Sequence, residues 1–231
     1  MRKIVYIHVP KCGGSSFAAA LRLRFLMSQR QIPLDHEIDP DLRGEDLIQA
    51  RYAARQQDLH AFINDGVRCI TGHVQPSPWA FAQAGYAWVT MLRPPEERFL
   101  SHYAYLQRRH PDPGRAETLE RFLDTADARR LASQYLFYFG GRSQDRCIDI
   151  SAMIERSIGC LSQFDLVGDL AAPDAFHGAL SRLAGGGILR LHRNAAPART
   201  RIPRPLRAQI EALCAADRAI YEAATQNRMA A

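Results

Sequence analysis

Residues 10–16 have the types and the order that bind a phosphate group. They read Pro-Lys-Cys-Gly-Gly-Ser-Ser and follow an apolar run at residues 4–9. A buried strand, a glycine turn that carries Lys11, and a helix that starts at the serines would surround an anion with backbone N–H groups and positive charge. The alternative is an ordinary strand-to-helix turn in which Lys11 is merely solvated.

The position of Lys11 indicates which anion this loop could hold. A nucleoside-triphosphate loop has its lysine after the glycines and a hydroxyl that binds Mg²⁺. Here Lys11 precedes Gly13 and Gly14, the turn is shorter, and no apolar strand ends in an obvious metal-binding aspartate. One phosphate or a phosphosulfate therefore fits this loop better than a metal-bound triphosphate.

A second candidate anion site follows the apolar residues 86–92. Arg93 comes directly after this expected strand, and Ser101 falls in the second turn of the helix expected after two prolines. A guanidinium and a hydroxyl near a helix start suit a phosphate group. Alternatively, Arg93 caps neighbouring carbonyl groups and Ser101 is only a small helical residue. Arg98, on the same helix, could equally form a surface ion pair.

Strands and helices alternate along the chain, which predicts a three-layer α/β/α fold with a mostly parallel sheet over residues 1–231. The expected strands are 4–9, 68–71, 86–92, 164–168 and 188–191. The expected helices are one from residue 15 onward, 45–64 with a break or kink, 77–84, one from residue 95 onward, two within 118–139, 151–161, 173–183, and a long amphipathic helix over 206–224. Ligands bind beyond the carboxyl ends of such strands, where both candidate anion sites would lie.

The composition limits the classes of partner. A formal charge of +6 favours anionic ligands but is too modest to indicate nucleic acid. The five cysteines are widely spaced and include no CxxC pair, so neither a disulfide framework nor a zinc site is expected. The polar loop that holds Asp35, His36, Glu37 and Asp39 is expected to be solvated rather than metal-binding. With no leader-like or membrane-spanning segment, the sequence predicts a soluble cytoplasmic protein.

Together, residues 8–16 and 92–101 resemble the two nucleotide signatures of sulfotransferases, which implies a P-loop-like fold of the sulfotransferase and nucleoside-phosphate kinase type. In that family the first signature holds the 5′-phosphosulfate, and the second the 3′-phosphate, of 3′-phosphoadenosine 5′-phosphosulfate (PAPS). The resemblance implies these donor-binding residues: Pro10, Lys11, Cys12, Gly13, Gly14, Ser15, Ser16, Arg93, Ser101 and Arg193. Adenosine 3′,5′-bisphosphate would be the product, and no metal is required.

The wider resemblance is to carbohydrate sulfotransferases, especially the heparan sulfate and uronyl 2-O-sulfotransferases. It rests on Gly72-His-Val74, the segments 79–82, 90–94 and 101–105, Phe164-Asp-Leu-Val-Gly168, the Arg193 loop, and Asp217 with Tyr221. The last two residues lie on one helical face, could bond each other, and are expected to be structural. The acceptor would be a hydroxyl of a glycan or a small molecule.

Sulfuryl transfer to a hydroxyl needs a base and a positive charge on the departing phosphate. The resemblance implies that His73 is the base, because an imidazole with a pKa of about 6.5 can accept a proton near neutrality. Lys11, with the amides of residues 13–16, would stabilise the phosphate charge. His8, His102 and His110 are competitors, and the alternative for His73 is a strand-end histidine bonded to a backbone carbonyl.

The chain departs from the family pattern at several positions. Cys12 replaces a common threonine, Ser15-Ser16 replaces Thr-Ser, Pro94 replaces an aspartate, and Thr71 stands where the 2-O-sulfotransferases have a second histidine. The family's Golgi anchor is not seen in these 231 residues, so a bare catalytic domain is expected. In the basic loop, Arg199, Thr200 and Arg201 match less well than Arg193 and could equally be solvated.

Two other functions remain open from the sequence. One is a small-molecule kinase that uses the same strand–loop–helix unit; the other is a non-catalytic module that binds adenosine 3′,5′-bisphosphate. The acceptor and the oligomeric state are not readable. Segments near 28–64, 75–82 and 103–140 would line the acceptor cleft, where Tyr103, Tyr105, Arg108 and Arg109 either bind a sugar or an anionic polymer or form a solvated helix face.

Overall fold

The computed structural model describes residues 2–109, 118–141, 149–191 and 202–226. In this part of the chain, parallel strands form one five-stranded sheet in the order β2-β3-β1-β4-β5. The strands are β1 (Lys3–Ile7), β2 (Gln29–Gln31), β3 (Cys69–Gly72), β4 (Tyr86–Leu92) and β5 (Leu166–Asp169). The predicted α/β class with a parallel sheet is confirmed.

The two central strands carry the most apolar sequence. Every residue of β4 is buried, and Ile4 to Ile7 of β1 are at most 1% exposed. Parallel strands covered on both faces have such continuous apolar runs. Because Ile7 pairs with Gly72 on one side and Thr90 on the other, the chain leaves β1, β3 and β4 at the same edge of the sheet.

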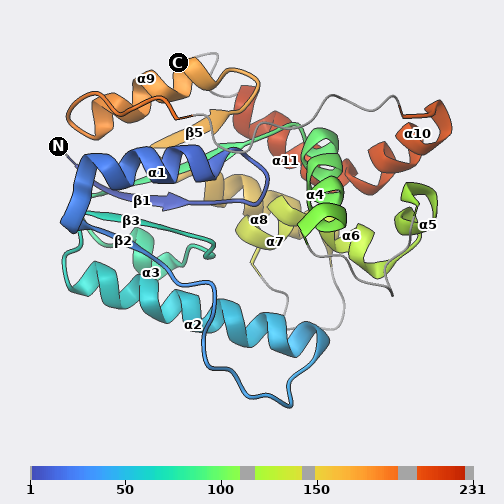
Figure 1. Cartoon of the computed structure of the whole chain (residues 1–231), viewed down its shortest axis with the longest axis horizontal. Helices are drawn as coiled ribbons and strands as arrows, with labels where there is room; N and C mark the ends of the chain where they lie inside the picture. Colours follow the sequence, from blue (N-terminus) through green and yellow to red (C-terminus); the bar gives the residue numbers. More distant parts are fainter. Residues whose placement is uncertain (1, 110–117, 142–148, 192–201, 227–231) are drawn as a thin grey trace.

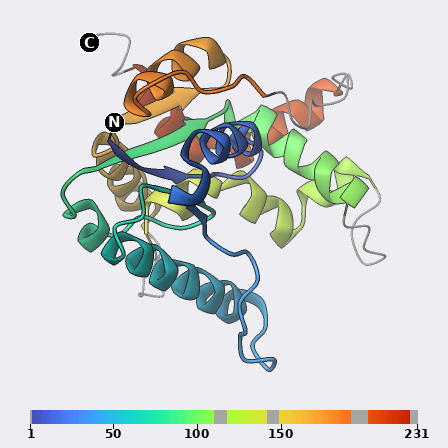
Figure 2. The same ribbon diagram turned by 60° about the vertical axis from the view of Figure 1, so that its left-hand side comes forward.

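Helices cover both faces of the sheet (Figures 1 and 2). On one face, Phe17 of α1 (Gly14–Phe25) packs edge-on against Phe176 of α9 (Pro173–Leu183), at 4.8 Å between ring centroids. On the other face, the ring of Trp88 in β4 packs against the ring of Phe81, the last residue of α3 (Pro78–Phe81), with 4.5 Å between ring centroids. Also on that side are α2 (Gly44–Asn64), α7 (Gln134–Phe139) and α8 (Ile150–Ser162).

A second apolar cluster lies beside the sheet, on the right in Figure 1. It forms between α4 (Pro95–Arg109), α5 (Leu119–Leu123), α6 (Ala126–Ala132) and α10 (Arg204–Leu213). Its buried members include Phe99, Phe122, Leu131 and Ile210. This cluster fixes α4, the helix that begins just after Arg93 and carries Ser101.

The structure corrects two predictions about strands. β2 was not expected, because Gln29–Gln31 is polar; it is a short strand at the edge of the sheet, where two of its side chains are exposed to solvent. Residues 188–191 were expected to form a strand but do not. The amide of Ile188 donates to the Ser181 hydroxyl, and its carbonyl bonds the His177 imidazole, so α9 side chains replace a strand partner.

Three predictions about helices are also corrected. α2 is one continuous helix without a break, and residues 118–139 contain three helices instead of two. The long C-terminal helix is divided at Cys214 into α10 and α11 (Ala215–Gln226). The division follows from packing, since Ile210 is buried in the cluster beside the sheet whereas Ile220 is buried in the main core.

Asp217 and Tyr221 do not bond each other. Asp217 is fully buried and forms an ion pair with Arg98, at 3.3 Å between Oδ2 and Nη2. The Tyr221 hydroxyl donates to Asp169 at the end of β5, at 2.8 Å. Both residues are structural, as predicted, but through long-range partners. Arg98 is therefore a core residue, and the surface ion pair considered from the sequence is wrong.

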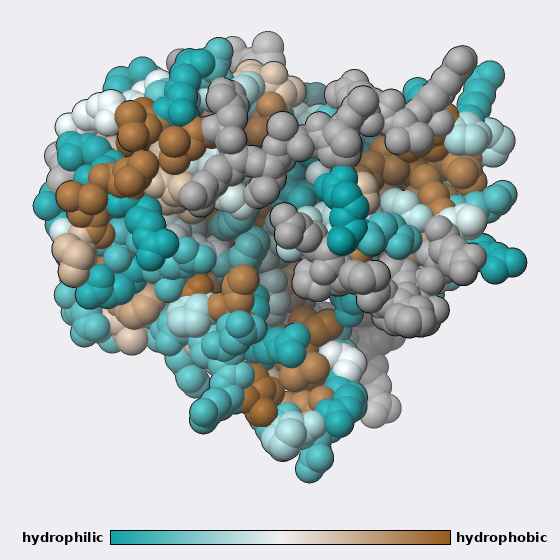
Figure 3. Space-filling view, in the orientation of Figure 1, coloured by the Kyte–Doolittle hydropathy of each residue, from teal (hydrophilic) through white to brown (hydrophobic). Residues whose placement is uncertain are grey.

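Hydrophilic side chains predominate on the face in Figure 3, with brown apolar areas distributed between them. The most exposed large apolar side chains of the described residues are Met27 at 85% and Leu26 at 67%. They lie in the turn that follows α1, away from the edge of the sheet where β1, β3 and β4 end. Among the described helices, none combines the length and the apolar composition needed to span a membrane.

Candidate active site

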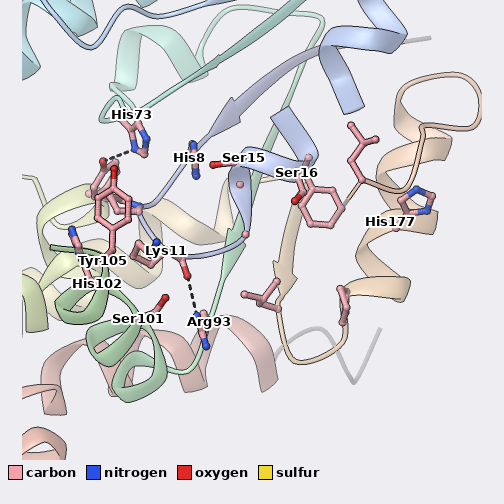
Figure 4. Close-up of a pocket in the computed structure, with 18 of the residues that line it drawn as sticks. His8, Lys11, Ser15, Ser16, His73, Arg93, Ser101, His102, Tyr105 and His177 are labelled. Atoms are coloured by element: carbon pink, nitrogen blue, oxygen red, sulfur yellow. Dashed lines mark hydrogen bonds between the residues drawn. The ribbon is translucent and has the colours of Figure 1, made fainter. Parts of the chain in front are cut away.

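A cavity of about 640 Å³ lies beyond the carboxyl ends of β1, β3 and β4 (Figure 4). This is the edge at which open α/β sheets bind ligands. Most of the site residues that the sequence predicted line this one cavity: Pro10, Lys11, Gly13, Gly14, Ser15, Ser16, His73, Arg93 and Ser101. The fold thus brings together the two candidate anion sites and the candidate base.

The loop after β1 contains two residues in the left-handed region of backbone conformation. Lys11 has φ +66° and Gly13 has φ +74°. Gly13 is the N-cap residue of α1, and its carbonyl accepts a hydrogen bond from the amide of Ser16 at 3.2 Å. The first-turn amides of a helix have no acceptor within the helix. The N-terminus of α1 therefore presents N–H groups and the positive end of its dipole to the cavity.

Gly14 allows a histidine to lie against the start of α1. A Cβ atom at this position would be 1.9 Å from Cδ2 of His8 and 2.2 Å from its Nε2. The His8 ring also stacks on His73, with 4.2 Å between ring centroids. The glycine is therefore required for the close approach of the phosphate loop to the two imidazoles.

The ammonium group of Lys11 lies over the ring of Tyr105, 4.2 Å from its centroid. Burial lowers the pKa of Lys11, and the positive charges of Arg108 and Arg93 lower it further. Of the charged side chains that line the described part of the cavity, four are cations (Lys11, Arg55, Arg93, Arg190) and Asp174 is the only anion. An anion bound here would relieve the repulsion between these cations.

Arg93 connects the two candidate anion sites. Its Nη1 donates to the carbonyl of Lys11 at 3.5 Å, and its Nη2 contacts Glu97 of α4 at 3.4 Å. Ser101, in the next turn of α4, points into the same part of the cavity (Figure 4). A phosphate could therefore reach the guanidinium of Arg93 and the hydroxyl of Ser101 together.

Cys12 is the described candidate that does not line the cavity. Its side chain is completely buried, and its amide donates to the carbonyl of Val9 at 3.4 Å. The thiol lies 3.5 Å from the hydroxyl of Tyr135, and burial raises the pKa of this thiol to about 11. Cys12 is thus a neutral residue that packs beneath the loop, which explains why a thiol can occupy this position.

His73 follows β3 and lies on the side of the cavity opposite Arg93. Its Nδ1 is 3.3 Å from the hydroxyl of Tyr138. Burial and the positive charge of Arg55 lower the pKa of His73 to about 4, partly offset by a hydrogen bond to the backbone of His8. The imidazole is therefore neutral near pH 7, the form that can accept a proton.

The other two described histidine competitors also line the cavity as neutral rings. Burial lowers the pKa of His8 well below its usual value, and the charges of His73 and Lys11 add to this effect. The pKa of His102 is lowered to about 3, first by burial and then by Arg98 and Lys11. Nδ1 of His102 is buried and makes no hydrogen bond within the described residues. His110 lies outside the described residues.

Sequence reasoning missed three side chains around His73. Arg55 donates to the carbonyls of His73 and Leu34, and its guanidinium lies over the ring of Tyr52. The Tyr52 hydroxyl bonds that of Tyr138, which contacts His73. The aromatic run in α7 was visible in the sequence, but no local pattern indicated that α2 and α7 meet at this site.

The far end of the cavity is mostly apolar. It lies past Ser16, on the side of His177 in Figure 4. The ion pair between Asp174 and Arg190, at 2.8 Å, is at this end. Its apolar lining comes from α1, from the turn after β5, from the start of α9 and from the segment before residue 192: Phe17, Leu170, Pro173, Leu189 and Leu191.

Arg193, Arg199, Thr200 and Arg201 lie outside the described residues. Within the residues that are described, no group of three or more His, Cys, Asp or Glu side chains is arranged to hold a metal ion. His36, from the polar loop considered above, instead bonds Asp58 of α2 at 2.7 Å.

No protein-family model matches this chain, and no curated protein matches it in sequence. Among solved structures it is similar to a sulfotransferase from Alicyclobacillus acidocaldarius, with a TM-score of 0.51 and 18% sequence identity. The match covers 96% of this chain and 95% of the other. At this level of identity the comparison shows the fold, so this chain has the α/β fold found in a sulfotransferase.

Proposed function

We propose that this protein is a sulfotransferase that transfers the sulfuryl group from PAPS to a hydroxyl. The observation that carries the proposal is the convergence of the loop at residues 10–16, the Arg93 and Ser101 pair, and neutral His73 on one cavity. The fold of the solved sulfotransferase supports the reaction class. In this proposal residues 1–231 act as one catalytic domain.

The donor would lie across the start of α1. Lys11 and the amides of Gly13 to Ser16, with Pro10 at the turn, would bind the 5′-phosphosulfate. Arg93 and Ser101 would bind the 3′-phosphate, and Arg193 is proposed to complete that site. Cys12 would support the loop from beneath, because its side chain does not reach the cavity.

The reaction would be an in-line displacement at sulfur. His73 accepts the proton of the acceptor hydroxyl while the acceptor oxygen forms its bond to sulfur. The bond between sulfur and the bridging phosphate oxygen breaks, and adenosine 3′,5′-bisphosphate leaves with the electron pair. Lys11 and the helix N-terminus stabilise the charge on this leaving group, so no step requires a metal.

The acceptor is proposed to be a carbohydrate hydroxyl, on the resemblance to carbohydrate sulfotransferases, with a small-molecule hydroxyl as the other possibility. His73 is surrounded by Tyr52, Tyr138 and Arg55, so this side of the cavity would receive the acceptor. A cytoplasmic location is likewise proposed, from the unpaired pattern of the cysteines.

The experiment is a transfer assay with ³⁵S-labelled PAPS and separate pools of glycans, lipids and phenols as acceptors. Labelled product from one pool would support the proposal and identify the acceptor class. The His73→Ala variant should lose about 10²–10⁴-fold in turnover. Near-normal turnover of this variant would remove His73 from the mechanism, and bisphosphate binding without transfer to any pool would favour the non-catalytic module.

A further inference from the structure

The hydroxyl of Tyr135, in α7, bonds the backbone of Arg93 at the end of β4. It accepts a hydrogen bond from the amide of Arg93 at 2.8 Å and donates one to the carbonyl of the same residue at 2.5 Å. Arg93 directly follows Leu92, the last residue of β4, so its amide and its carbonyl both lie just beyond the strand. The conformation in which Arg93 leaves the sheet is therefore held by one side chain from a distant helix.

The same hydroxyl contacts the phosphate loop. Sγ of Cys12 lies 3.5 Å away, and burial keeps this thiol protonated by raising its pKa. A tyrosine hydroxyl has one donor and two acceptor positions. The Arg93 carbonyl uses the donor and the Arg93 amide uses one acceptor, which leaves the second acceptor for the Cys12 thiol; the carbonyl of Pro10, 3.7 Å from Sγ, is the other acceptor within reach of the thiol proton. The contact joins the residue beside Lys11 to the turn that carries Arg93.

Tyr135 is itself held rigidly. It is completely buried, and its amide donates to Oδ2 of Asp217 at 2.8 Å. Asp217 pairs with Arg98, whose guanidinium also lies over the Tyr135 ring, 5.3 Å from its centroid. Because Arg98 belongs to α4, the network also reaches the helix that carries Ser101.

We propose that Tyr135 is a positioning residue that holds the loop at residues 10–16 and the Arg93 turn at the separation of the two phosphates of one nucleotide. This proposal rests on the proposed function, since it presumes a ligand with a 5′- and a 3′-phosphate. Tyr135 touches neither phosphate in this arrangement and acts through the backbone of Arg93 and the thiol of Cys12.

The test compares two ligands, adenosine 3′,5′-bisphosphate and adenosine 5′-monophosphate, by isothermal titration calorimetry. In the wild type the 3′-phosphate should strengthen binding. In Tyr135→Phe, which keeps the buried ring, that advantage should fall about tenfold, because the Arg93 amide loses its partner and the turn loosens. In an Arg93→Ala background the same substitution should no longer change the ratio of the two affinities.

Tyr86→Phe is the matched control. Tyr86 is a buried residue at the start of β4, and its hydroxyl also bonds backbone carbonyls, that of Val67 at 2.8 Å and that of Ile63 at 3.5 Å. This variant loses one buried hydroxyl at the opposite end of the strand. It should lower the melting temperature without changing the affinity ratio. A purely structural role for Tyr135 predicts the same behaviour in Tyr135→Phe, and that result would overturn the proposal.

Two further results separate this proposal from the proposed function. If the wild type does not bind the bisphosphate, the function fails and the inference fails with it. If the wild type binds and Tyr135→Phe keeps the full 3′-phosphate advantage, only the inference fails. Should Tyr135→Phe not fold, Cys12→Ala breaks the same link from the loop side; an unchanged affinity ratio there overturns the inference, and a reduced ratio supports it.

Discussion

Lys11 lies among charges of its own sign. Arg108 and Arg93 both lower the pKa of its ammonium group, and its contact with Tyr105 is to an aromatic face. Placing cations close together costs free energy, and a bound polyanion would turn this repulsion into attraction. Strained electrostatics of this kind are typical of sites that bind charged ligands.

Gly14→Ala should damage the site through a steric clash. The new Cβ would overlap the His8 ring, which stacks on His73, so both imidazoles must move. We expect a loss of about 1–3 kcal/mol in the free energy of unfolding, measured by urea denaturation, together with a strong loss of transfer activity.

Gly159→Ala is the control for this substitution. Gly159 lies in α8, and a Cβ there meets no atom within 4 Å. Alanine in a helix interior is more favourable than glycine by about 0.5–1 kcal/mol, so this variant should be slightly more stable and fully active. If the two substitutions change the free energy of unfolding and the transfer activity equally, a steric clash at Gly14 is not the cause.

The neutrality of His73 can be measured directly. Because burial and Arg55 lower its pKa to about 4, its NMR signals should not titrate between pH 8 and pH 5 in the free protein. The ring remains neutral, and able to accept a proton, until the pH falls through about 4. Adenosine 3′,5′-bisphosphate should raise the midpoint, since negative charge nearby favours the imidazolium form.

The His73→Gln variant identifies the signal to be followed, and circular dichroism establishes the pH range in which the protein stays folded. A midpoint near 6.5, the ordinary value for histidine, would show that the ring is solvated in solution. That result would show that burial and Arg55 do not lower the pKa of His73 in solution.

At the scale of elements, one buried carboxylate joins three helices. Asp217 of α11 bonds the amides of Tyr135 and Leu136 in α7, at 2.8 and 3.0 Å, and pairs with Arg98 of α4. These helices support the Arg93 turn and Ser101. The geometry of the second candidate anion site therefore depends on contacts far from the cavity.

Asp217→Asn should destabilise the protein by about 3–5 kcal/mol, measured by urea denaturation near pH 7. The variant leaves Arg98 buried without a counter-charge, and one amide oxygen cannot replace both carboxylate oxygens. The control is Asp127→Asn, which breaks an exposed pair with Arg130. Such surface pairs contribute about 0–1 kcal/mol, so similar losses in the two variants would be evidence against a core role for Asp217.

At the scale of the molecule, ligand binding should appear as thermal stabilisation. A ligand at 100 times its Kd stabilises the native state by about 2.7 kcal/mol, which for a chain of this size raises Tm by about 5–10 °C. We expect this shift with adenosine 3′,5′-bisphosphate in the presence of EDTA. A shift produced only by ATP with Mg²⁺ would instead support the kinase alternative.

Much of the fold could be predicted because its signals are local. The continuous apolar runs of β1 and β4 predict buried parallel strands, and the alternation of strands and helices predicts three layers. β2 could not be predicted, because a polar edge strand of three residues has no pattern of its own. Residues 188–191 have a strand-like composition, but their backbone partners are side chains of α9.

The same distinction applies to the site. The order of residues 10–16 by itself determined a tight turn, a helix start and a lysine beside them, since these depend on the backbone freedom of glycine and on neighbouring residues. Only the tertiary structure decided that Cys12 faces the core, that burial and Arg55 lower the pKa of His73, and that Tyr138 contacts its ring. The Cys12 thiol and its partner Tyr135 are 123 positions apart. Such pairs are selected by packing of the whole chain, which no local pattern records.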